Sequence, residues 1–268
     1  MNASLDAASA GRLAHAPTRR PLPPVLARLA ILIALLALWE FYARLFGDPA
    51  FVRPPTEVVH ALFGKILAED TVRQAILLTF WELALAFALA VAIALPVGLV
   101  VGATRFTHRT LFPIVLLLYA IPQVTVLPLF ILMFGLGPAG KIAFGVSHGV
   151  FPIVVNVVAG LRNVNPLFVN SARSMGASRL QIVRRVVLPS VIGSFFAGLR
   201  LSMTLTLLGV LLAELYVSTA GIGYFTQLYS ETFDPAPLFA LITVLALMAI
   251  ALNEAVRRAE TRSSRWRG

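Results

Sequence analysis

The stretch 163–189, NVNPLFVNSARSMGASRLQIVRRVVLP, interrupts a series of apolar runs that are each long enough to cross a membrane. Asn165 can cap a helix whose first residue is Pro166, where a missing N–H group costs nothing. Gly176 can end that helix in the left-handed conformation. The first half of the stretch therefore predicts a short, well-defined helix rather than a loose loop.

The second half of the stretch carries signals for another helix. Ser178 and Gln181 have the spacing of a capping box, and Pro189 lies where the next long apolar helix begins. Four arginines favour a position in water on the cytoplasmic side of a membrane: Arg173, Arg179, Arg184 and Arg185. A membrane protein that folds a basic element on this face is expected to dock a partner there.

The composition is that of an integral membrane protein. The 268 residues are 59% hydrophobic and 13% charged, with a mean hydropathy of +0.87, whereas soluble domains are about a quarter charged. A net charge of +10 suggests nucleic acid in a soluble protein, but here the positive residues flank apolar spans. The absence of cysteine excludes disulfides, thiolate nucleophiles and cysteine-ligated metals.

Apolar runs between charged residues predict an all-α membrane fold with six transmembrane helices, because irregular backbone cannot face lipid. We expect the helices at about 25–46, 75–103, within 110–140, 142–161, 189–213 and 236–252. The second is longer than a bilayer needs, so it should tilt or project outward and leave Glu82 near the interface.

The charge distribution predicts that both termini of this multi-pass protein are cytoplasmic. Most of the 22 lysines and arginines lie near the termini or in the loops after the second and fourth predicted helices. Positive residues gather on the cytoplasmic side. The outer loops are expected to carry acids: Asp48, Glu57, Glu69, Asp70, Glu214, Glu231 and Asp234.

Three segments are expected along the chain. Residues 1–24, rich in Ala, Pro and Arg, should form a flexible cytoplasmic tail. The first apolar run is expected to be retained as a helix, since Glu40 and Arg44 stand where a signal peptide would be cut. The transmembrane domain should cover 25–256, and a basic cytoplasmic tail 257–268.

No arrangement of residues points to catalysis. The four histidines are scattered, and no H-E-x-x-H, carboxylate pair, G-x-S-x-G or G-x-x-x-x-G-K-[ST] pattern occurs. We therefore expect no enzyme activity, cofactor or metal site in this chain. If the protein takes part in ATP-driven transport, a separate subunit must hydrolyse the ATP.

Arg200 is the one charge well inside a predicted span. A buried arginine costs at least about 2.5–3.5 kcal/mol at the bilayer centre, so it should face protein or water. It could lie beside the path of an anionic substrate, or it could brace the structure by bonding to carbonyls or a subunit interface. Both roles stay open.

The stretch 163–189 also resembles the EAA loop of ABC importer permeases, roughly E-A-A-x3-G-x9-I-x-L-P. Only Ala172 of the first triplet is identical, but Gly176 and the later L-P pair stand at the family's spacing. The resemblance implies that this loop couples to an ATPase. The residues expected to form the coupling loop are Asn170, Ser171, Ala172, Gly176, Ala177, Ser178, Leu188 and Pro189.

Nearly the whole chain is similar to the nitrate, sulfonate and taurine branch of these permeases. The matching pieces are LWE at 38–40, RPPTEVV at 53–59, PVGL at 96–99, FGLG at 134–137, GLRL at 198–201 and GIGY at 221–224. The resemblance implies a type I permease of the bacterial cell (inner) membrane. Such a permease forms a homodimer with two ATP-binding subunits and an extracytoplasmic solute-binding protein. Sulfonates, nitrate and taurine are the implied solutes, and small heterocyclic vitamin precursors stay open.

Two other classes of protein remain from the residues alone. A non-transporting membrane scaffold would need neither a docking element nor an outer receptor loop. An ion-coupled secondary transporter would be expected to carry more acids inside the membrane, whereas Glu40 and Glu82 are predicted near interfaces. Neighbouring genes for an ATPase and a secreted binding protein would separate these classes.

Overall fold

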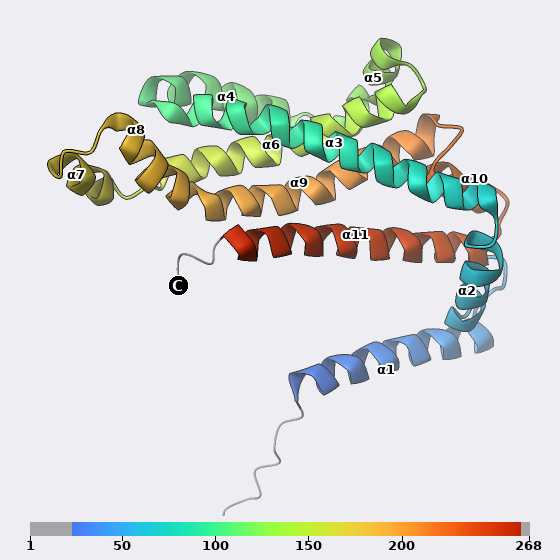
Figure 1. Cartoon of the computed structure of the whole chain (residues 1–268). Helices are drawn as coiled ribbons and strands as arrows, with labels where there is room; N and C mark the ends of the chain where they lie inside the picture. Colours follow the sequence, from blue (N-terminus) through green and yellow to red (C-terminus); the bar gives the residue numbers. More distant parts are fainter. Residues whose placement is uncertain (1–22, 264–268) are drawn as a thin grey trace, which may run out of the picture.

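The computed structural model describes residues 23–263 as a bundle of helices (Figure 1). Five helical segments in this range are long and apolar enough to cross a membrane, and a sharply bent pair makes a sixth if its two halves count as one span. The long helices are α1 (Pro24–Leu45), α3 (Asp70–Ala103), α6 (Pro138–Arg162), α9 (Leu188–Val217) and α11 (Pro235–Ser263). Residues 1–22 and 264–268, which hold most of the predicted N-terminal tail and the end of the predicted C-terminal tail, lie outside the described residues.

The core forms where α6 packs between α3 and α9. Small residues let these helices approach closely, as is common within membranes. A Cβ atom on Gly149 of α6 would lie 2.2 Å from the Thr206 Oγ1 of α9, and one on Gly98 of α3 would lie 2.9 Å from Val157 of α6. The glycines along the apolar spans thus mark helix contacts.

The third predicted span is a broken one, and not a single helix within 110–140. It consists of α4 (Arg105–Ala120), the 3₁₀ turn Gln123–Val126 and α5 (Leu127–Phe134), with a bend of 83° between its two halves. Pro122 has no N–H group to continue the helix, and the residue before a proline is driven out of the helical conformation. Ile121 accordingly adopts extended backbone angles.

Helix α1 lies apart from the other spans and joins them through a short helical segment (Figure 1). This segment consists of α2 (Pro55–Ala61) and the π-helical turn Leu62–Ile66. The apolar side chains of α1 are exposed all round, and its main aromatic contact is an edge-on one between Trp39 and Phe239 of α11. A helix that is apolar on every face needs lipid or another membrane helix around it.

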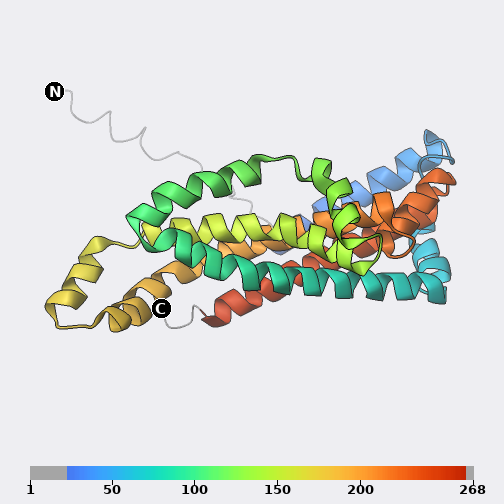
Figure 2. The ribbon, with the colours of Figure 1, turned by 90° about the horizontal axis from the view of Figure 1, so that it is seen from above.

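The two ends of the bundle are built differently. Two short helices, α7 (Pro166–Ser174) and α8 (Arg179–Ile182), project beyond one end, while α2 and α10 (Ile222–Glu231) lie at the other (Figures 1 and 2). Helix α1 starts, and α11 finishes, toward the end that carries α7 and α8 (Figure 1). Residues 257–263, which we placed in the C-terminal tail, continue α11 as helix.

Candidate functional site

We call α7, the turn at Gly176 and α8 the projecting element. The first half of this element has the local structure that its sequence predicts. The Asn165 side chain accepts a hydrogen bond from the Leu167 N–H at 2.9 Å, and Pro166 is the first residue of α7. Gly176 closes the helix with a φ of +79°, and the Ala177 N–H donates back to the Ala172 carbonyl at 3.0 Å. The helix ends here because only glycine adopts this backbone angle without strain.

The second half is also capped as predicted and then joins the membrane span directly. The Gln181 N–H donates to Ser178 Oγ at 3.3 Å, and the Ser178 N–H donates to Gln181 Oε1 at 2.7 Å. After α8, a π-helical turn over Val183–Val187 leads into α9. A movement of α7 and α8 can therefore be transmitted into a long transmembrane helix without a flexible joint.

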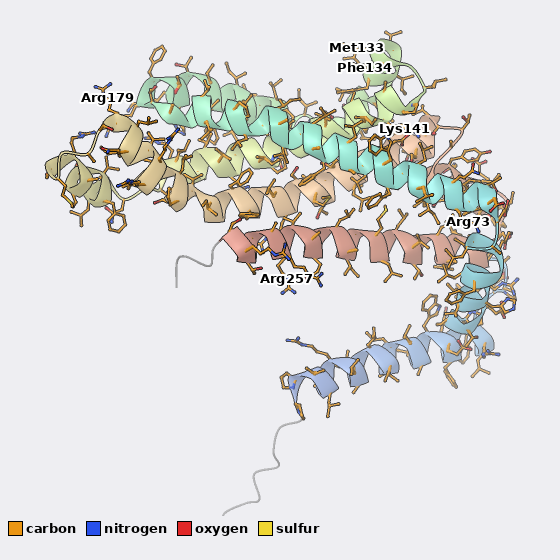
Figure 3. All side chains as sticks on the ribbon, viewed as in Figure 1. Arg73, Met133, Phe134, Lys141, Arg179 and Arg257 are labelled. Atoms are coloured by element: carbon orange, nitrogen blue, oxygen red, sulfur yellow. The ribbon has the colours of Figure 1, made fainter. Side chains whose placement is uncertain are left out.

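The projecting element exposes apolar side chains in a part of the chain outside the spans. Leu167, Phe168 and Leu180 are each more than half exposed, and Met175 is 86% exposed. Exposed arginines stand among them, including Arg179 at the tip of the molecule (Figure 3). Apolar patches rimmed by polar residues mark interaction sites, so the element has the surface of a docking site.

The structure distributes the predicted loop residues over two faces of the element. Ser171, Ala172 and Pro189 line one surface hollow, in which α7 meets the start of α9. Asn170 and Leu188 line a different cavity, on the side of the bundle. Gly176, Ala177 and Ser178 form the turn between α7 and α8.

A second cluster of charges is buried at the opposite end of the bundle. Lys141 of α6 lies between two carboxylates, with its Nζ 2.7 Å from Glu82 Oε1 of α3 and 3.8 Å from Glu214 Oε1 of α9. Lys141 is 3% exposed and both glutamates are fully buried. Figure 3 shows Lys141 near α10, far from Arg179. Buried charges need such partners, because leaving water costs several kcal/mol per ion.

Hydrogen bonds extend this cluster to the start of α10. Glu214 accepts from Thr79 Oγ1 at 2.7 Å and from the Gly223 N–H at 2.8 Å. Lys141 also donates to the Ala220 carbonyl at 3.3 Å. Gly221 has a φ of +110°, and a Cβ atom there would lie 2.1 Å from the Glu214 carboxylate. The network thus fixes α3, α6, α9 and α10 to one another.

The sequence did not reveal this network, and the prediction for one of its members, Glu214, was wrong. Glu82, expected near an interface, is buried twelve residues into α3, and Glu214, expected in an outer loop, lies in the last turn of α9. Lys141 is inside α6, although the predicted span began one residue later. The three-residue spacing of Thr79 and Glu82 places both on one face of an apolar helix, and this was the available signal.

Arg200 makes an ion pair that the sequence did not reveal. Its Nη1 lies 3.3 Å from Glu260 Oε2, near the end of α11, and its side chain is 45% exposed. Helix α9 continues past the end of α11 toward α8 (Figure 1). Arg200 is therefore level with a helix end, where a charge is tolerated more easily than at the centre of a span.

No cofactor or metal site emerges from the described residues. Among residues 23–263, no three or more histidine, aspartate or glutamate side chains gather in a way that could hold a metal ion. The two buried glutamates of the network face Lys141, and Glu214 also accepts a hydrogen bond from the Gly223 N–H. The arrangement is suited to holding helices together and to docking a partner.

Comparison with protein families gives one match that covers well over half of the chain. Residues 94–265 match the family described as "Binding-protein-dependent transport system inner membrane component". The match includes the projecting element, Lys141, Glu214 and Arg200, but it begins after Glu82 and after α1.

Several characterised proteins are similar over most of their length. The riboflavin transport permease RibX of Chloroflexus aurantiacus is 30% identical over 91% of this chain and 91% of its own. The taurine transport permease TauC of Escherichia coli is 28% identical over 90% and 89%. The formylaminopyrimidine transport permease ThiX of Halalkalibacterium halodurans is 28% identical over 88% and 93%.

A solved structure shares the fold. It is the inward-facing MetNI methionine ABC transporter, of which one chain superposes with a TM-score of 0.64 at 18% identity. The superposition covers 72% of this chain and 96% of that one. The remaining part of this chain is extra to the shared helical architecture.

Proposed function

This chain belongs to the binding-protein-dependent transport system inner membrane components, and we propose that it carries a small anionic solute of the sulfonate, nitrate or taurine type. It is a multi-pass membrane protein and the permease subunit of an ABC importer. Such a subunit is not itself an enzyme, because ATP is hydrolysed in a separate ATP-binding subunit, and a solute-binding protein delivers the solute.

We propose that α7, Gly176 and α8 form the site that couples this chain to the ATP-binding subunit. The observation that carries the proposal is the exposed apolar surface of a rigidly capped element, including Met175 at 86% exposure. A soluble partner with an apolar cleft would bury this surface. Because α8 continues into α9 through a helical turn, motion of the partner would reach the membrane span.

The proposed assembly contains two copies of this chain and two ATP-binding subunits. The projecting element and both termini face the cytoplasm, and the end that carries α2 and α10 faces the solute-binding protein. The arginines of 162–185 support this orientation through the preference of positive residues for the cytoplasmic side. Apolar side chains left exposed along α4 and α5 offer a surface for the second copy: Leu117, Leu118, Leu129, Leu132 and Met133.

The names of the relatives support the proposed class of solute. Permeases for taurine, for aliphatic sulfonates and for nitrate are all similar over three quarters or more of this chain. All three names describe small solutes with a compact oxyanion group. A small heterocycle is the second candidate, because the formylaminopyrimidine and riboflavin permeases match with similar identities.

Transport by the reconstituted complex tests the proposal. The chain, its ATP-binding subunit and its solute-binding protein are placed in proteoliposomes, and ATP-dependent uptake of labelled taurine, an alkanesulfonate and nitrate is measured. We expect uptake of one of these anions and none of riboflavin. Uptake of the heterocycle alone would overturn the anionic solute while leaving the permease function intact.

Coupling is tested separately with Gly176→Val. The new side chain is strained at a φ of +79°, so we expect normal insertion but ATP hydrolysis that no longer drives uptake. Gly135→Val is the matched control, since Gly135 has the same φ and likewise no atom within 4 Å of a new Cβ. Coupled transport in both variants would refute the coupling role of the element.

A further inference from the structure

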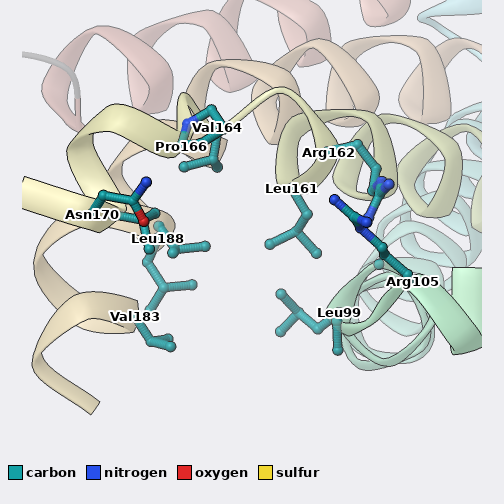
Figure 4. A pocket seen from close by; sticks show the side chains of 13 residues that line it. Leu99, Arg105, Leu161, Arg162, Val164, Pro166, Asn170, Val183 and Leu188 are labelled. Atoms are coloured by element: carbon teal, nitrogen blue, oxygen red, sulfur yellow. The ribbon is translucent and has the colours of Figure 1, made fainter. Parts of the chain in front are cut away.

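A large cavity opens beside the projecting element, at the end of the bundle that we place in the cytoplasm. Its volume is about 690 Å³, and it lies where the end of α3 and the start of α4 face α7, the π-helical turn and the start of α9 (Figure 4). It is far larger than the narrow gaps between packed helices. The cavity has room for a ligand, and an apolar occupant would add packing contacts that the open cavity lacks.

The wall of the cavity is mainly aliphatic. Figure 4 shows Leu99 and Leu161 on the side of the bundle, opposite Val183 and Leu188 from the element. Among the lining residues Asn170 is the one uncharged polar side chain, and no acidic residue is present. A small hydrophilic solute would leave most of this wall without a matching partner, whereas a hydrocarbon chain would fill it.

Two arginines stand at one side of the cavity with their side chains directed toward each other (Figure 4). Arg105 is the first residue of α4, and Arg162 is the last residue of α6. Both are exposed, and neither makes a salt bridge with a described residue, whereas the outer lysines and Arg200 do. Two adjacent like charges repel, so an anion between them would remove this repulsion and gain hydrogen bonds to both.

We propose that the cavity binds an anionic phospholipid of the cytoplasmic leaflet, with its phosphate between Arg105 and Arg162 and an acyl chain along Leu99, Leu161 and Leu188. The charges lie at the ends of the spans α3 and α6, as a headgroup requires, and the apolar wall adjoins them. Basic pockets between helices on this side of a membrane are known to hold anionic headgroups. The proposal uses the orientation given above but not the identity of the solute.

The bound lipid would connect the projecting element to the bundle. Asn170 of α7 and Leu188 of α9 line the cavity from one side, while α3 and α4 line it from the other. An occupant therefore bridges two parts of the chain that the cavity keeps apart. We expect the efficiency of ATP-coupled transport to depend on anionic lipid for this reason.

A probe placed in the cavity tests the proposal directly. The chain has no native cysteine, so Val183→Cys gives a single site for a bimane label inside the cavity. The labelled full-length chain is placed in nanodiscs with phospholipids brominated on their acyl chains, which quench the label on contact. Brominated phosphatidylglycerol should reach half-maximal quenching at a mole fraction about tenfold lower than brominated phosphatidylcholine does, from the attraction of two arginines.

Matched variants assign the preference to the two arginines. The double variant Arg105→Gln with Arg162→Gln should abolish the preference for phosphatidylglycerol, whereas Arg105→Lys with Arg162→Lys should retain it. The control is Arg109→Gln, one turn along α4 and outside the cavity, which should leave the preference unchanged. A label at Val100, exposed but not part of the lining, should show no preference.

Several results would overturn the proposal. Equal quenching by both brominated lipids, with both arginines present, would overturn it even if the double glutamine variant failed to fold. A preference for phosphatidylglycerol that persists in a folded double glutamine variant would also overturn the proposal. Loss of the preference on adding inorganic phosphate, but not chloride at the same ionic strength, would show that the cavity takes a soluble anion instead.

Discussion

The two ends of this bundle handle charge in opposite ways. At the outer end, which we propose faces the solute-binding protein, Lys141 is buried between the carboxylates of Glu82 and Glu214, and Glu214 also accepts a hydrogen bond from the start of α10. At the other end the arginines of α7 and α8 stay in water beside exposed apolar side chains. The first arrangement links helices to one another, whereas the second leaves its surface for a partner. Removing a charge should therefore cost stability at one end and function at the other.

The largest effect is expected from Lys141→Met. Breaking a buried ion pair by removing one partner costs about 3–5 kcal/mol, because the remaining charges stay buried without compensation. Thermal unfolding of the purified protein in detergent should show a large loss, or the protein should fail to accumulate. Arg179→Met removes an exposed positive charge as the control and should leave the unfolding temperature nearly unchanged.

A second variant sharpens this expectation. Combining Lys141→Met with Glu82→Gln removes both members of the close pair, and it should regain a large part of the lost stability. Equal stability of the single lysine variant and the native chain would show that the network does not hold the bundle together.

The two ends also differ in what surrounds a left-handed glycine. Gly221→Ala introduces backbone strain and drives a Cβ atom into the Glu214 carboxylate, whereas Gly176→Ala meets open space. Strain alone costs about 1–2 kcal/mol, so this is the loss expected for Gly176→Ala, and Gly221→Ala should lose clearly more. Denaturant unfolding of the two alanine variants measures the difference, and equal losses would contradict the buried geometry.

A smaller effect is expected at the pair between Arg200 and Glu260. Both side chains are partly exposed and one contact at 3.3 Å joins them, so a double-mutant cycle should give a coupling of about 1 kcal/mol or less. Lysine can make this single contact, and Arg200→Lys should keep most of the stability. A coupling several times larger would indicate that Arg200 is enclosed in the assembled transporter.

The smallest effect concerns the outer end and depends on pH. Lys65 donates a hydrogen bond to Asp234 at 2.8 Å, and this bond raises the pKa of the lysine. A raised pKa in the folded state stabilises the protein below the ordinary lysine range, and this stabilisation is lost as the pH rises through the folded pKa. The unfolding temperature should fall slightly more steeply above about pH 10 in the native chain than in Lys65→Met.

Local signals made the projecting element predictable. Asn165, Pro166, Gly176 and the Ser178–Gln181 box act within a few residues of one another, so their roles can be read from spacing alone. The long spans were predictable for a similar reason, because the bilayer requires a continuous apolar length.

The outer network could not be predicted in the same way. Its members come from α3, α6, α9 and α10, and only the packing of these helices brings Glu82, Lys141 and Glu214 together. In the sequence alone, each of these charged residues resembles the charged end of an apolar span. The partner of Arg200 was hidden for the same reason, since Glu260 follows sixty residues later in another helix.

The central claim is that the exposed face of α7 and α8 receives the ATP-binding subunit, and protection of a single cysteine tests it most directly. Met175→Cys places a thiol on the most exposed apolar side chain of the element, in a chain without native cysteine. Its rate of reaction with a water-soluble maleimide is measured on the purified permease, alone and in complex with the ATP-binding subunit. Thr219→Cys, exposed at the outer end, is the control. We predict that the complex strongly slows the reaction at position 175 and leaves position 219 unchanged, whereas equal rates at position 175 with and without the subunit would contradict the account.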